Sequence, residues 1–298
     1  MVHRCSQPVC AGPFAPDQKD DNGLVGIVWV PINEYLKRKL PSCHGFLKRR
    51  AAGWRRAHAP LVPAFRRIRG EFFWIHPRLL TVETHDSEPH IYEWIVNHLP
   101  RGGVFFDVGA HYGWLSLKAA RHVGRSGRVV AFEPSPVLLE ILHYHQRRNR
   151  LPQMTIVGSA VSETDAAEAR FYLLNGGLSS RNSLTIGPPG LPFLDSVEKA
   201  ATEVPTVKLD SFCGKSGITP DVIKIDVEGS EGMVLRGAAS ILRRFGPVLV
   251  VSTHPYWFPA SESAGELFDF LAGCGYRVKD SHVVQFEGYE TGDYLLAV

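Results

Sequence analysis

The sequence predicts an α/β domain built on a mostly parallel sheet, and three observations support this class. Apolar runs of strand length alternate with helical segments from about residue 88 onward, as they do when helices cover both faces of a parallel sheet. The run at 104–106 passes through a glycine-bearing turn directly into a helix. The last two runs have no helix between them, which predicts an antiparallel hairpin at the end of the sheet.

Apolar periodicity sets the bounds of each expected element. Helices are expected at 88–99, 114–123, 136–148 and 231–242 and around 267–272. Strands are expected at 104–106, 128–132, 154–157, 170–174, 222–227, 247–252, 276–278, 283–286 and 294–298. Residues 175–205, rich in Gly, Ser and Pro, are expected to form a loop, and a loop of this length is commonly functional.

Length limits the number of domains, and the cysteines argue against a disulfide-rich or zinc-binding protein. A chain of 298 residues suits one domain of about 220–230 residues with an extension, or two small domains. The five cysteines are odd in number and form no CxxC pair, so neither a disulfide scaffold nor a zinc site is expected, and a cytoplasmic location is favoured. No apolar run approaches the ~20 residues that span a bilayer.

Residues 1–70 are expected to form a basic, partly disordered extension to a domain at 71–298. Between Lys37 and Arg69 the chain has eleven Lys and Arg residues and no Asp or Glu. Such a block can meet an anionic membrane surface or a phosphorylated substrate. It can equally be a solvated helical face that packs on the domain through its apolar residues. Nucleic acid is a less favoured partner, because no RNA-binding signature or zinc finger accompanies the block.

The turn after the first strand predicts the cofactor. A strand, a glycine turn and a helix, followed about twenty residues later by an acid, are typical of nucleotide-binding α/β units. Gly109 and Gly113 allow positive φ and a close approach of the backbone, and Glu133 is the acid. Positions 111 and 114 are His and Trp in place of glycine, which suits a cofactor without a pyrophosphate, such as S-adenosylmethionine.

Each part of this cofactor has expected contacts. We expect Glu133 to accept hydrogen bonds from both ribose hydroxyls and Asp107 to face the methionine ammonium group. The alternative is a structural turn whose aspartate caps the next helix. Residues 159–161, at the end of the third strand, are expected near the adenine. The predicted cofactor-binding residues are Asp107, Gly109, Ala110, His111, Tyr112, Gly113, Glu133, Ser135, Ser159, Ala160 and Val161.

Three residues at the ends of later strands are candidates for catalysis. Lys224, Asp226 and Glu228 share one face of a strand, where buried charges must be paired or open onto a cleft. We expect Asp226 and Glu228 to act in catalysis. His254, just past the fifth strand, can serve as a general base. The alternatives are a Lys224–Asp226 ion pair with Glu228 solvated, and a histidine that only hydrogen-bonds within its loop.

The residues that follow this strand have an expected structural role. Ser230 is expected to cap the next helix, and Glu231 suits the positive end of the helix dipole in its first turn. A divalent metal ion held by Asp226 and Glu228 stays an open alternative, but the sequence offers no third ligand, so no metal-binding residues are assigned.

These stretches resemble the FkbM family of class I, S-adenosylmethionine-dependent methyltransferases. The resemblance runs from about residue 88 to the last residue and rests on FFDVGAHYGWLSL, VVAFEPSP, VKLDSF and VIKIDVEGSEGMVLRGA. It implies a Rossmann-like fold with a seven-stranded, mostly parallel sheet whose last strand is antiparallel. It also implies O-methylation of a hydroxyl on a sugar, glycoconjugate or natural product, so a small molecule or glycan is the expected acceptor.

Two other functions stay open at the level of sequence. One is methylation of a nucleic acid that is held by the basic block at 37–69. The other is a non-catalytic scaffold that keeps the fold and docks on a membrane. The expected location is cytoplasmic, and peripheral to the membrane where the basic block meets lipid headgroups.

Overall fold

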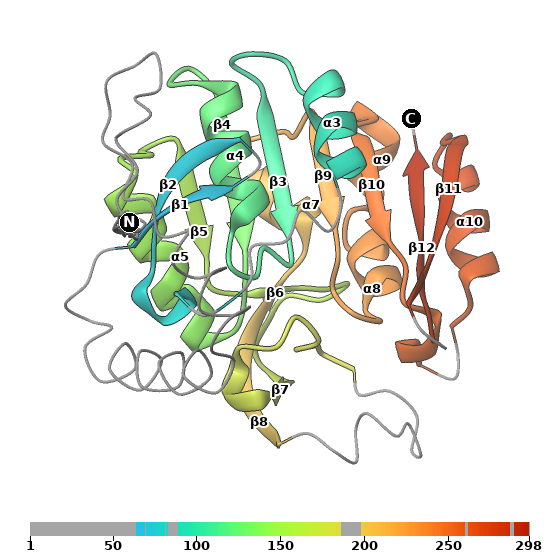
Figure 1. The fold of residues 1–298 in the computed structure, drawn as a ribbon. Helices are drawn as coiled ribbons and strands as arrows, with labels where there is room; N and C mark the ends of the chain where they lie inside the picture. The colour runs from blue at the N-terminus through green and yellow to red at the C-terminus, as the bar shows by residue number, and fades with distance from the viewer. Residues whose placement is uncertain are drawn as a thin grey trace, which may run out of the picture. The chain divides into compact units, whose positions relative to one another are not determined.

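The computed structural model describes residues 64–68, 70–80, 82, 89–185, 198–259, 262–286 and 289–297. These residues belong to one compact unit that begins at His58. In this unit helices flank one large sheet, and a small sheet lies below the ends of its parallel strands (Figure 1). The predictions made for residues 1–63 lie outside the described residues.

The large sheet is mostly parallel, which confirms the predicted α/β class. Its strands are β3 (Val104–Val108), β4 (Arg128–Phe132), β5 (Met154–Val157), β9 (Val222–Ile225), β10 (Val248–Ser252), β11 (Val278–Phe286) and β12 (Tyr289–Ala297). Within the described ranges their order is β11-β12-β10-β9-β3-β4-β5. The strands from β10 to β5 run parallel, whereas β12 is antiparallel to both of its neighbours.

Helices cover both faces of the large sheet. They are α3 (Pro89–His98), α4 (Trp114–Val123), α5 (Pro136–Arg148), α7 (Leu209–Ser216), α8 (Glu231–Arg236), α9 (Ala239–Phe245) and α10 (Ala264–Gly273). Successive strand residues point to opposite sides, so Phe105 packs with residues of α3 to α5 while Phe106 packs with residues of α7 to α10. Both rings are fully buried, and each burial contributes about 1.5–3 kcal/mol.

Two parts of the predicted pattern are wrong. The expected loop at 175–205 contains much of β8 (Lys199–Val207), which pairs with β7 (Ala166–Leu174) and β6 (Ala160–Val161) in the small sheet. Most of β8 is exposed, so its apolar alternation is weak. The expected helix at 231–242 is two helices, α8 and α9. They separate at Gly237, where a Cβ would lie 2.0 Å from the Ser162 carbonyl oxygen.

A hairpin crosses the domain boundary that the sequence predicts at residue 70. β1 (Ala64–Ile68) pairs antiparallel with β2 (Glu71–Ile75). Ile68 and Phe73 belong to the same buried cluster as residues of α3 to α5, so residues 64–68 form a strand of the domain instead of part of a helical face. The rest of the basic block lies outside the described residues. In the part of the chain that is described, no helix is long and apolar enough to cross a membrane.

Candidate active site

The turn after β3 is shaped by close contacts within the protein. Gly109 has a φ of 77°, and a Cβ at this position would lie 1.9 Å from the Asp226 carbonyl oxygen. Gly113 has a φ of 76°, and its Cβ would lie 2.4 Å from a methyl carbon of Leu142. Glycine meets both demands without strain, so the turn packs tightly against the end of β9 and against α5. The positive φ expected at both glycines is confirmed.

Glu133, directly after β4, presents a buried carboxylate to this turn. Its two oxygens each accept one backbone hydrogen bond of 2.9 Å, from the amides of His111 and Ser135. Burial raises the pKa of Glu133 to about 7, although these two amides act in the opposite direction. Each oxygen keeps a second lone pair, so the carboxylate can still accept hydrogen bonds from a pair of hydroxyls.

Asp107 lies beneath the turn and not at its surface. Its side chain is 1 % exposed, Oδ2 accepts a hydrogen bond of 2.5 Å from the Ser116 hydroxyl, and Oδ1 lies 3.6 Å from the Lys224 ammonium. Burial raises the pKa of this carboxyl. Asp107 therefore connects β3 to α4 through Ser116 and lies beside Lys224. Its contact with a methionine ammonium group stays a prediction.

A pocket of about 490 Å³, part of it open to solvent, lies between this turn and the ends of β4, β5 and β9. The predicted residues that line it are Gly109, His111, Glu133, Ser159, Ala160, Val161 and the catalytic candidate Asp226. Residues predicted from separate stretches of sequence therefore meet in one pocket.

The remaining predicted cofactor residues do not line the pocket, and two of them support its wall. The Tyr112 hydroxyl donates to the Leu178 carbonyl at 2.9 Å, and the Ser135 hydroxyl donates to the Gly177 carbonyl at 3.0 Å. Ala110 belongs to the buried core. These contacts hold the segment 177–185 against the turn.

That segment contributes site residues that the sequence did not assign. Ser179, Ser180, Asn182 and Leu184 line the pocket, together with Phe171 of β7. The Asn182 side chain donates to the Gly177 carbonyl at 2.8 Å, which closes the segment on itself. Loop length and composition at 175–205 signalled a functional segment, but they carried no information on which pocket it would line.

Lys224 of β9 joins the turn to the acidic residues that follow the strand. Its Nζ donates to the Gly109 carbonyl at 3.0 Å and lies 3.1 Å from Oδ2 of Asp226. The ion pair considered from the sequence is therefore present. Burial acts against ionisation of Asp226, yet Lys224 and His254 hold its pKa below the usual range. Glu228 is not solvated as that alternative supposed, because its side chain is only 12 % exposed.

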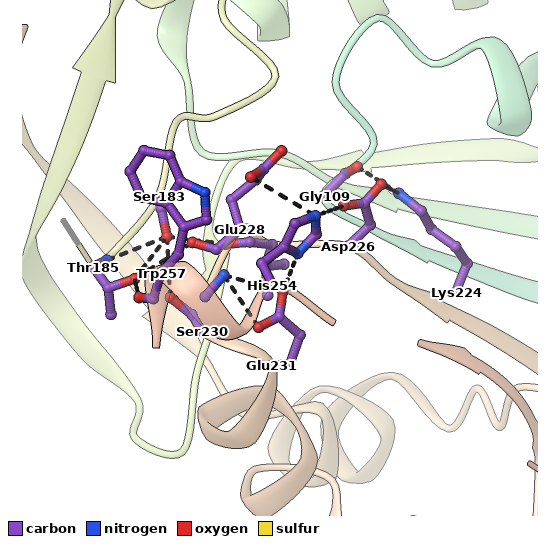
Figure 2. A network of polar contacts seen from close by, with 12 residues as sticks. Gly109, Ser183, Thr185, Lys224, Asp226, Glu228, Ser230, Glu231, His254 and Trp257 are labelled. Carbon is purple, nitrogen blue, oxygen red and sulfur yellow. Dashed lines mark hydrogen bonds and ion pairs between the residues drawn. The ribbon is translucent and has the colours of Figure 1, made fainter. Parts of the chain in front are cut away.

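His254 lies among three carboxylates at the carboxyl ends of β9 and β10 (Figure 2). Nδ1 lies 2.8 Å from Oε1 of Glu231, and Nε2 lies 3.7 Å from one oxygen of Asp226 and from one of Glu228. Burial disfavours the charged ring, but the carboxylates outweigh this effect and raise the pKa of His254 to about 10. Without a bound metal ion, a ring with this pKa carries its proton at neutral pH, which argues against the predicted role of general base.

Glu231 is fully buried and orients His254. Both of its oxygens accept from the Gly229 amide at 3.1 Å, and Oε1 also contacts the ring. From the sequence, Glu231 was assigned only to the first turn of a helix. No local signal linked it to a histidine 23 residues later. Ser230 does not cap α8 through its side chain, because its hydroxyl lies beside that of Ser183 at 3.2 Å.

Comparison with known proteins gives a family match over most of the domain. Residues 107–278, more than half of the chain, match the family described as Methyltransferase FkbM domain. A curated relative, the protein-L-isoaspartate O-methyltransferase of Caenorhabditis elegans, is 30% identical over 104 residues. The aligned part is 32% of this chain and 46% of the relative, so the chain spans less than half the length of that protein.

Solved structures with distant similarity include a methyltransferase and a fibrillarin. The methyltransferase FkbM of Methylobacillus flagellatus is similar over 65% of this chain and 43% of its own chain, with 21% identity and a TM-score of 0.43. The fibrillarin of Aeropyrum pernix, solved with natively bound S-adenosyl-L-methionine, is similar over 80% of this chain and 83% of its own, with 12% identity and a TM-score of 0.41.

Proposed function

Because the chain belongs to the FkbM methyltransferase family, we propose that it transfers a methyl group from S-adenosylmethionine to a hydroxyl oxygen of a sugar, glycoconjugate or natural product. The family match confirms the family that the sequence predicted. One observation carries the proposal. Glu133, suited to the ribose of the cofactor, and Asp226, suited to an acceptor, line the same pocket.

The pocket residues fit the chemistry of the cofactor. Glu133 offers acceptors to two hydroxyl donors, and Ser159, Ala160 and Val161 provide small side chains at the end of β5 for an aromatic base. When bound, S-adenosylmethionine supplies a methyl group on a sulfonium that is already activated for displacement. The protein has to hold this group and an acceptor in line and keep water out.

The acceptor side of the pocket is the end of β9. An alcohol is a poor nucleophile at neutral pH, and a positioned proton acceptor typically accelerates its reaction about 10²–10⁴-fold. Asp226 lines the pocket, and its Oδ1 is directed toward the cluster that contains Glu228 and His254. We assign the proton acceptor to the carboxylates of Asp226 and Glu228, and we assign the exclusion of water to the segment 177–185.

Transfer of a labelled methyl group tests this function. The full chain is incubated with S-adenosylmethionine labelled in its methyl group and with fractionated cell extract, and mass spectrometry identifies what gains the label. We expect label on an oxygen of a small molecule or glycan, and binding of S-adenosylhomocysteine in calorimetry. Absence of that binding would contradict methyl transfer. Label on nucleic acid would overturn the proposed acceptor class.

A further inference from the structure

Three side chains at the carboxyl ends of β9 and β10 offer ligand atoms for a metal ion. Asp226, Glu228 and His254 each present one such atom, and these three atoms lie within 4.8 Å of one another. We propose that they bind a divalent cation, through one oxygen of each carboxylate and through Nε2 of the imidazole. This inference deepens the proposed function and rests on it for its purpose, since Asp226 also lines the pocket expected to hold the acceptor.

The distances leave room for one ion. Nε2 of His254 lies 3.7 Å from Oδ1 of Asp226 and 3.7 Å from Oε2 of Glu228. With the two oxygens no more than 4.8 Å apart, a point equidistant from the three atoms lies at most about 2.4 Å from each. Bonds from oxygen and nitrogen ligands to divalent cations span roughly 2.0–2.6 Å, so the ligands already stand near bonding distance of a common centre.

The distances on the Nε2 side are longer than those of a direct charged hydrogen bond. A charged N–H group between carboxylates normally approaches an oxygen to about 2.7–2.9 Å. Nδ1 does so with Glu231, at 2.8 Å, whereas Nε2 stays at 3.7 Å from both of its carboxylate neighbours. Equal and longer separations on one side of the ring are the arrangement expected when three ligands share an ion.

Glu231 gives His254 the support that metal-binding histidines usually have. Such a histidine commonly donates its second ring N–H to a carboxylate, which sets the tautomer and the direction of the ring. Glu231 is 0 % exposed, accepts from the Gly229 amide and contacts Nδ1. This contact turns the Nε2 side of the ring toward Asp226 and Glu228 (Figure 2). This buried contact is separate from the three ligands and points to the same site.

The formal charges around the cluster also favour a cation. Lys224 pairs with Oδ2 of Asp226, so Oδ1 of the same carboxylate remains directed toward Nε2. When the ring of His254 is neutral, the cluster contains four carboxylates and two positively charged side chains. Its formal charge is then −2, which a divalent ion balances. These groups, taken from the described residues, are Asp107, Asp226, Glu228, Glu231, Lys224 and Arg181.

A bound cation would give the site a definite task. Such an ion would lower the pKa of a coordinated hydroxyl and hold its oxygen in place, and the second carboxylate oxygen of Glu228 would accept the proton. Carboxylate ligands favour Mg²⁺ and Mn²⁺, and a histidine ligand is compatible with Mn²⁺. Mn²⁺ is therefore the probe of choice, because its free form is measured directly by electron paramagnetic resonance.

The test is titration of the full chain with Mn²⁺ after removal of metals with EDTA. We expect one tightly bound ion per chain. Glu228→Gln and His254→Ala should each weaken binding at least tenfold, and Glu231→Gln should weaken it about 10- to 100-fold through the ring it orients. Glu168→Gln, an exposed residue of β7, is the matched control and should bind as the wild type does.

The outcomes separate this inference from the proposed function. Glu228→Gln keeps the shape of the side chain, and thermal melting shows whether each variant folds. Wild-type binding no tighter than that of the His254→Ala and Glu228→Gln variants overturns the cation site. In that case binding of S-adenosylhomocysteine in EDTA would leave the proposed function standing. Mn²⁺ binding at this site without binding of S-adenosylhomocysteine would support the cation site and overturn the proposed function.

Discussion

Glu133 and Glu228 both follow strands of the same sheet and both are largely buried, yet they are held in different ways. The oxygens of Glu133 accept hydrogen bonds from two backbone amides. One oxygen of Glu228 instead lies 3.7 Å from Nε2 of His254, an ionisable group. A carboxylate that is held by backbone amides can accept further hydrogen bonds from neutral donors such as hydroxyls. A carboxylate beside ionisable side chains can instead bind a proton or a metal ion. The cofactor region, around Glu133, and the acidic region, around Glu228 and His254, therefore differ in their chemistry.

Gly109 contacts residues of both regions. The carbonyl of Gly109 accepts from Lys224, and the α-carbon of Gly109 packs against the carbonyl of Asp226. A change at Gly109 should disturb both regions, whereas changes at Glu133 or Glu228 should affect one of them.

The largest effect is expected at this junction. Gly109→Ala places a methyl group 1.9 Å from the Asp226 carbonyl oxygen and puts a side chain at a φ of 77°. We expect a loss of about 3 kcal/mol or more in the free energy of unfolding, measured by urea denaturation. Gly217→Ala is the control, because Gly217 has a left-handed φ of 68° with nothing within 4 Å of its Cβ position, and a loss of about 1 kcal/mol is expected. Equal losses in the two variants would show that the contact with Asp226 is unimportant.

The next largest effect separates the two glutamates. Glu133→Gln leaves one acceptor oxygen and turns an amide donor toward a backbone N–H, so S-adenosylhomocysteine should bind about 30- to 100-fold more weakly in calorimetry. Glu228→Gln should change this affinity less than about threefold, because its surroundings serve the other region. Glu140→Gln, 57 % exposed on α5, is the control. Equal losses at Glu133 and Glu228 would contradict the division into two regions.

A smaller effect is expected from pH. Burial raises the pKa of Glu133 to about 7, so this carboxyl gains a proton as the pH falls through 7 and can no longer accept from both hydroxyls. Affinity for S-adenosylhomocysteine should therefore fall between pH 8 and 5.5, approaching about tenfold per unit below pH 7. His111 stays neutral in this range because burial lowers its pKa to about 4. The same slope in Glu133→Gln would assign the titration to another group.

The smallest effect concerns the segment that closes the cofactor region. Tyr112→Phe removes the hydrogen bond of 2.9 Å to the Leu178 carbonyl, which contributes about 1 kcal/mol. We expect faster amide hydrogen exchange in 177–185 and a loss of affinity for S-adenosylhomocysteine of a few fold. Tyr144→Phe is the control, because the edge-on contact of this ring with His76 does not need the hydroxyl. Unchanged exchange in Tyr112→Phe would show that other contacts hold the segment.

Local sequence determined the elements around the cofactor region. The predicted bounds of α4, α5, β4 and β5 match the structure, because apolar periodicity and the residues at each end are properties of a few neighbouring positions. Glu133 and Asp226 could be assigned to one pocket for a related reason. The carboxyl ends of parallel strands meet at one edge of a sheet, so acids at those positions come together.

Only the tertiary structure decided how the polar groups pair. His254 contacts Glu231 and lies beside Asp226 and Glu228, and the segment 177–185 lines the pocket. All of these placements join residues far apart in the chain. No periodic pattern encodes such contacts, since each depends on which strand ends and loops become neighbours after packing. The sequence alone therefore determined the strands, the turn and the family. Packing determined that the buried carboxylate of Glu133 contacts backbone amides and that Glu228 lies beside an ionisable side chain.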